Sequence, residues 1–139
     1  MFLEIIIFII LIITVLVIAA WQPKILFYKD FVKITGISGM KIERKKIVSI
    51  TMADVPLPAM SRSSNFGIYL FGINKGYFTV WEDSDYYNLK DNDTCKKYVQ
   101  TNKPPFIVIT LTNDLKIFIN FRNKTLMEKY YLELLKYVS

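Results

Sequence analysis

Residues 106–121 read FIVITLTNDLKIFINF, two apolar and β-branched runs on either side of the polar residues Thr112, Asn113 and Asp114. Short runs of this composition are typical of β-strands. Asn and Asp tolerate the left-handed backbone that a tight turn requires. The segment therefore predicts a β-hairpin with strands over 106–111 and 116–121.

Short alternating stretches of the same kind precede this hairpin, which predicts a half-buried antiparallel sheet. The Pro- and Ser-rich residues 54–67 and the polar residues 82–94 are predicted to be exposed loops between strands. Gly36–Gly39 is expected to form a tight turn. The expected strands are 31–35, 40–43, 47–52, 76–81, 96–100, 106–111 and 116–121.

The period of the apolar residues becomes helical after the hairpin. Leu126, Tyr130, Leu134 and Val138 recur at every fourth position, which predicts an amphipathic helix over 123–137. Asn123 or Thr125 can cap its start. We expect this helix to close the core of a mainly β domain.

The N-terminus is an apolar run from Ile5 to Ala20, broken only by Thr14. As a helix, residues 2–21 would reach about 30 Å, the thickness of one hydrocarbon core. The run predicts a transmembrane helix over residues 1–22, followed by a juxtamembrane linker over 23–30. A cleaved secretory signal is the alternative, although no Lys or Arg precedes the run and the run exceeds the usual length.

Basic residues suggest an orientation for such an anchor. Lys24, Lys29 and Lys33 follow the run, and none precedes it, which predicts a single-pass protein of the cell membrane with its C-terminal domain in the cytoplasm. Cys95 is the single cysteine, as expected in a reducing compartment.

The chain carries a formal charge of +6, and Glu4 is the only charged residue before position 23, so the remainder carries +7. Lys41, Arg44, Lys45 and Lys46 form its densest basic group, and such a group can contact anionic lipid headgroups, nucleic acid or protein. No nucleic-acid-binding signature surrounds them, so no nucleic acid partner is predicted. The alternative is a solvated hairpin turn.

The sequence offers little for catalysis. It has no histidine, which excludes Ser-His-Asp and Cys-His sites and the commonest zinc ligand. Cys95 stands next to Lys96 and Lys97 of an expected strand and is better explained as a partly buried small residue. The aspartates of residues 82–94 lack the spacing of a calcium-binding loop. We therefore expect no enzyme activity, no cofactor and no metal.

Several motifs resemble the bacterial pleckstrin-homology-like (PH-like) domains of small membrane-attached proteins. The motifs are GMKI (39–42), KIVSI (46–50), NFGIYLFG (65–72), GYF (76–78) and KYVQTNKPPFIVI (97–109). The resemblance implies that residues 31–139 form a seven-stranded antiparallel sandwich or partial barrel capped by the C-terminal helix. Aromatic residues of the third motif, Tyr69 and Phe71, join the basic group as expected lipid or partner contacts.

Together these features predict a membrane-anchored, non-catalytic interaction module that binds a protein or peptide near the membrane. Two alternatives follow from the same residues. One is a peripheral sensor of anionic lipid headgroups, and the other is an exported ligand-binding domain released by signal cleavage.

Overall fold

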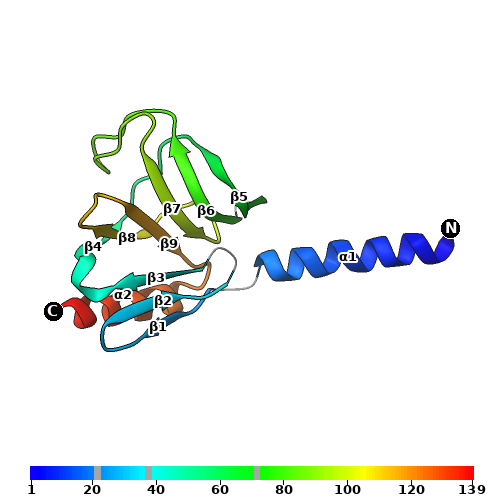
Figure 1. The fold of residues 1–139 in the computed structure, drawn as a ribbon, viewed down its shortest axis with the longest axis horizontal. Helices are drawn as coiled ribbons and strands as arrows, with labels where there is room; N and C mark the ends of the chain where they lie inside the picture. Colours follow the sequence, from blue (N-terminus) through cyan, green and yellow to red (C-terminus); the bar gives the residue numbers. More distant parts are fainter. Residues whose placement is uncertain (21–22, 37–38, 71–72) are drawn as a thin grey trace.

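The computed structural model describes residues 1–20, 23–36, 39–70 and 73–139, although the side chains of residues 18–20, 62–70 and 73–74 lie outside that description. Helices stand at both ends of a β-rich chain (Figure 1). The elements are α1 (Phe2–Ala20), β1 (Ile25–Phe27), β2 (Phe31–Ile34), β3 (Met40–Glu43), a 3₁₀ turn (Arg44–Lys46), β4 (Ile47–Ala53), β5 (Met60–Leu70), β6 (Ile73–Val80), β7 (Thr94–Val99), β8 (Phe106–Leu111), β9 (Lys116–Asn120) and α2 (Lys124–Val138).

Within the described residues the strands form two sheets, one of three strands in the order β1-β2-β3 and one of six in the order β4-β8-β9-β7-β6-β5. Neighbouring strands are antiparallel except β7 and β9, which pair in parallel. The expected seven-stranded antiparallel PH-like sandwich is therefore wrong. The fold is a mixed, sheet-rich one, because β9 joins β7 on one side and β8 on the other.

The small sheet shows the alternation expected when one face is buried and the other meets water. Val32, Ile34 and Ile42 are buried, whereas Lys33 and Lys41 between them are exposed. The buried face belongs to the same apolar cluster as Met127 and Leu134 of α2 and the isoleucines of β8 and β9. This cluster joins the small sheet, α2 and one face of the large sheet.

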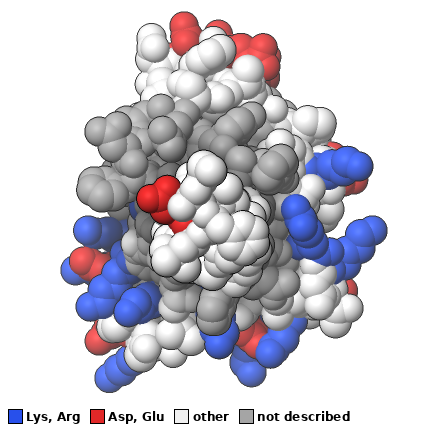
Figure 2. Space-filling model, turned by 90° about the vertical axis from the view of Figure 1, so that its right-hand side faces the viewer, with Lys and Arg blue, Asp and Glu red and all other residues white. Residues whose placement is uncertain are grey.

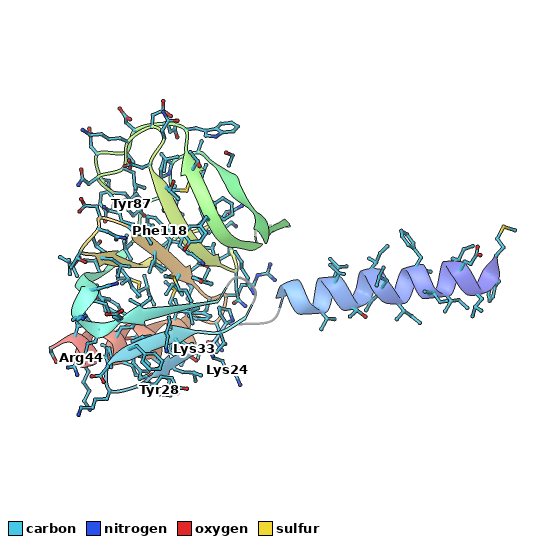
Figure 3. All side chains as sticks on the ribbon, viewed as in Figure 1. Lys24, Tyr28, Lys33, Arg44, Tyr87 and Phe118 are labelled. Atoms are coloured by element: carbon cyan, nitrogen blue, oxygen red, sulfur yellow. The ribbon has the colours of Figure 1, made fainter. Side chains whose placement is uncertain are left out.

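The other face of the large sheet has a core of its own. Phe106, Val108 and Phe118 point into it, and Tyr87 packs edge-on against Phe118 with ring centroids 5.3 Å apart (Figure 3). Because both faces are covered, β8 and β9 are almost continuously apolar. Residues 82–94, expected to be a solvated loop, place Tyr87 and Leu89 in this core.

The connection between β7 and β8 is held by one buried amide. The Asn120 side chain, 1% exposed, accepts hydrogen bonds from the backbone N–H groups of Gln100 (2.9 Å) and Thr101 (3.3 Å). Its amide nitrogen donates to the carbonyls of Thr101 (2.8 Å) and Lys103 (3.1 Å). These bonds satisfy backbone groups that the turn leaves without strand partners.

Several elements differ from the expected ones. The expected linker over 23–30 contains strand β1, with Ile25 buried, and the expected loop over 54–67 contains the start of β5. The hairpin over 106–121 is present as β8 and β9, and Asp114 has the left-handed backbone (φ 65°) predicted for its turn. The C-terminal helix is also present, and the Asn123 side chain accepts from the Leu126 N–H as its N-cap.

Helix α1 projects away from both sheets, and its described apolar side chains are exposed (Figure 1). No helix in the described part of the chain combines the length and the apolar character needed to cross a membrane. The expectation of a single-pass transmembrane helix over 1–22 is therefore wrong for the described residues, and the membrane and single-pass assignments lose their support.

Candidate anion-binding face

The exposed face of the small sheet brings two lysines together. Lys33 of β2 lies directly opposite Lys41 of β3 in an antiparallel pair, and both side chains are exposed. Directly opposed residues place their Cβ atoms about 5 Å apart, and like charges at such positions destabilise a sheet. The pair is a local cost to the fold that an anion would relieve.

Aromatic rings border these lysines. Tyr28 and Phe31 are stacked, with centroids 4.6 Å apart and planes 19° apart, and the Lys41 ammonium lies 4.1 Å from the Phe31 ring centroid. Figure 3 shows Lys33 in β2 and Tyr28 in the connection between β1 and β2, at the same end of the molecule. The contact orients the Lys41 side chain across the sheet, because an ammonium is attracted to the face of an aromatic ring.

Arg44 continues the positive charge beyond β3. Its guanidinium carbon lies 4.8 Å from the Tyr137 ring centroid, and its N–H donates to the Asp30 carbonyl (2.9 Å). Tyr137 of α2 donates its hydroxyl to the Tyr28 carbonyl (2.7 Å). The C-terminal helix therefore positions one end of this surface. We call Tyr28, Phe31, Lys33, Lys41 and Arg44 the basic face.

Two open cavities border the basic face, and both are lined by Phe31 and Lys41. One, of about 700 Å³, also contains Tyr28 and Lys33, and the other, of about 690 Å³, contains Arg44 and Lys45. Together they have room for an extended ligand.

The acidic residues near the basic face leave its lysines free of ion pairs. The Glu43 carboxylate lies 3.6 Å from the ammonium groups of both Lys45 and Lys46. No ion pair of Lys33 or Lys41 is found in residues 1–20, 23–36, 39–70 and 73–139. In Figure 2, acidic side chains gather at the top, whereas most of the Lys and Arg side chains lie lower, on both flanks. Asp30 and Glu43 line the cavity that contains Arg44, whereas no acidic side chain among the described residues lines the cavity around Lys33.

The structure brings together only part of the predicted site. Lys41 and Arg44 belong to the basic face, and Lys45 lines one of its cavities. Lys46 lines a smaller cavity beside the β8–β9 turn. Tyr69 lies in β5 opposite Asn74 with its side chain outside the description, and Phe71 lies outside the described residues altogether.

Three residues of the basic face were not predicted as contacts, namely Tyr28, Phe31 and Lys33. Their signal in the sequence is the alternation of aromatic and basic residues between positions 27 and 33. This alternation becomes a surface only through the pairing of β2 with β3.

The single cysteine lies away from the basic face. Cys95 is fully buried in β7, and burial raises the pKa of its thiol to about 12, which keeps it protonated at neutral pH. Across the described ranges no group of three or more metal-ligating side chains is found. What the basic face can do chemically is hold negative charge against aromatic rings.

Comparison with known proteins gave no match to a protein-family model, to a curated protein or to a solved structure. The resemblance to PH-like domains stays a prediction from sequence motifs.

Proposed function

We propose that the chain is a non-catalytic binding module whose basic face takes an acidic segment of a partner protein. The observation that supports this most is the direct opposition of Lys33 and Lys41 without an ion pair among the described residues. A carboxylate placed between them would turn a repulsive pair into two attractive contacts.

The shape of the face favours a peptide over a compact anion. The two cavities meet at Phe31 and Lys41, so the basic side chains extend from Lys33 to Arg44 rather than converging on one point, with Asp30 and Glu43 also lining the cavity at Arg44. The rings of Tyr28 and Phe31 offer apolar contact between the charges. Alternating acidic and apolar side chains in an extended segment would match this arrangement.

The stacked rings also limit the entropy that binding would cost. The Phe31 ring already contacts both Tyr28 and the Lys41 ammonium. Side chains that are held before binding lose less freedom when a ligand arrives. Association should be fast and salt-dependent, because the charges steer an acidic partner.

The test is fluorescence polarisation of a labelled oligo-glutamate peptide with the full chain, held in a neutral detergent because the apolar side chains of α1 are exposed. An oligo-glutamine peptide of equal length is the uncharged comparison. We expect binding of oligo-glutamate alone, weakened by about tenfold or more in the double variant Lys33→Gln, Lys41→Gln.

The matched control is the double variant Lys90→Gln, Lys124→Gln, which removes the same charge from exposed positions outside the basic face. Its binding should equal that of the parent chain. Equal losses in both double variants would show a response to net charge and would contradict a defined site. Binding to phosphatidylserine vesicles without binding to the peptide would favour the anionic lipid headgroup as partner instead.

A further inference from the structure

A second charged group lies in an unusual setting on the opposite side of the large sheet from α2. Lys97 of β7 is 6% exposed, and its ammonium lies 4.4 Å from the Phe78 ring centroid. Its partner on β6 is Gly76, which has no side chain, and its partner on β9 is Phe118. The lysine therefore lies on the apolar face that Phe78 and Phe118 share.

No carboxylate of the described residues forms an ion pair with this lysine. Among the residues that the structure describes, no ion pair and no hydrogen-bond acceptor is found for the Lys97 ammonium. Burial lowers the pKa of Lys97. A charged lysine in an apolar environment lowers the stability of the fold unless an anion binds beside it.

A cavity of about 270 Å³ opens at this lysine. Apolar side chains line most of it, and Trp81 stands at its border with its indole N–H donating to the Ser61 hydroxyl (2.8 Å). The lining residues are Pro56, Leu57, Pro58, Ala59, Met60, Trp81, Lys97 and Asn102. The site combines one buried cation with apolar walls, as small-ligand sites commonly do.

We propose that this cavity binds a small carboxylate with an apolar body, whose carboxylate lies against the Lys97 ammonium and whose apolar part contacts Leu57, Met60 and Trp81. A carboxylate satisfies the buried charge, and the apolar body replaces water at the prolines and the indole. This site involves neither an acidic peptide nor the basic face. A negative result for this site therefore does not contradict the proposed function, and the reverse is also true.

The position of Trp81 gives a direct measurement. A Trp21→Phe background leaves Trp81 as the single tryptophan, because the chain has two. Benzoate is the probe, and benzyl alcohol is its uncharged counterpart of similar size. We expect a saturable change in Trp81 emission with benzoate at a dissociation constant on the order of 1 mM or below, and binding of benzyl alcohol at least about tenfold weaker.

Lys97→Met in the same background removes the charge and keeps the length of the side chain. It should weaken benzoate binding on the order of tenfold to a hundredfold and leave benzyl alcohol binding unchanged. Lys90→Met, at an exposed position, is the matched control and should bind benzoate like the parent. The proposal is overturned if benzoate produces no saturable change, if both probes bind equally, or if Lys97→Met binds benzoate as the parent does.

Discussion

Lys33 and Lys41 face each other across β2 and β3 with their charges unopposed in the described structure. The pair does not contribute to the stability of the sheet, because like charges directly opposite one another destabilise it. The pair is tolerated beside a ring that holds one ammonium in place. A binding surface that is strained when empty gains stability when it is occupied.

Neutralising one member of the pair should stabilise the unliganded chain. We expect Lys33→Gln to raise the free energy of unfolding by about 0.5 kcal/mol at low ionic strength, while the contact of Lys41 with Phe31 remains. The gain should vanish near 1 M salt, where the screening length is about 3 Å. Urea denaturation at both salt concentrations measures it. Lys29→Gln is the control, and a gain that persists in high salt would contradict repulsion as its cause.

Asn120 should be among the costliest polar residues to replace. Asn120→Ala removes two acceptor and two donor bonds and leaves backbone groups of Gln100 and Thr101 without them. We expect a loss of about 2–4 kcal/mol in urea denaturation, since each unsatisfied buried group costs about 1–3 kcal/mol. Asn123→Ala, which removes only the cap of α2, should cost about 1 kcal/mol. Equal losses would mean that the Asn120 network contributes no more than a helix cap.

Gly39 cannot gain a side chain without moving the backbone. A Cβ atom there would lie 2.7 Å from the Ile34 carbonyl oxygen and 3.1 Å from that of Gly36. Gly39→Ala should therefore cost about 1–3 kcal/mol and lower the melting temperature. Gly36→Ala meets no atom within 4 Å but has a positive φ of 102°, so it should cost about 1–2 kcal/mol through its backbone alone. Both glycines line the cavity around Lys33, but only a side chain at position 39 would contact the backbone of β2. Addition of the oligo-glutamate peptide should therefore stabilise Gly39→Ala less than Gly36→Ala.

Lys97→Met should make the chain more stable at neutral pH. Burial lowers the pKa of Lys97 below its ordinary value, so the unfolded chain binds a proton more readily than the folded chain does. The buried charge therefore costs no stability above the unfolded pKa of about 10.5, where the lysine is neutral in both states. Its full cost appears once the pH has fallen below the folded pKa. We expect a gain at pH 7 that shrinks as the pH approaches about 10.5. A gain independent of pH would indicate better packing rather than removal of a buried charge.

The Cys95 thiol should react only when the sheet opens. Its pKa is raised to about 12 by burial and it is fully enclosed in β7. Labelling by an aromatic disulfide reagent at about pH 8 should be at least about a thousandfold slower than in urea-unfolded chain. The variant Cys95→Ala, Ser139→Cys carries an exposed thiol at the C-terminus and should react fast. Comparable rates for the two thiols would contradict the burial of Cys95.

Local patterns predicted the elements that depend on neighbouring residues. The hairpin of β8 and β9 and the helix α2 follow from turn chemistry and from the helical period. The parallel pairing of β7 with β9 did not follow, because no local signal states which distant strand a strand will join. Strand β1 was not predicted because it has only three residues. Strand β5 was not predicted over its first residues because they belong to the Pro- and Ser-rich stretch.

The candidate site depended on a register that the sequence did not reveal. A four-residue turn over 36–39 would pair Thr35 with Met40, whereas β2 and β3 pair Ile34 with Met40. Thr35 instead accepts a hydrogen bond from the Lys24 N–H through its hydroxyl oxygen (2.9 Å). This shift of one residue sets Lys33 opposite Lys41, since strand faces alternate with every residue. The burial of Lys97 was not predicted for a similar reason, because the pairing of β7 with Gly76 of β6 and Phe118 of β9 decides where its side chain lies.

The central place of β9 has a consequence for synthesis on the ribosome. In the described residues, strands β4 and β8 on one side, and β5, β6 and β7 on the other, are joined within the large sheet only through β9. A growing polypeptide must therefore expose most of its length before these two groups can meet, and both present uncovered strand edges until then. Nascent chains stalled before residue 116 should be sensitive to proteases and prone to aggregate, and they should become resistant once α2 has also emerged.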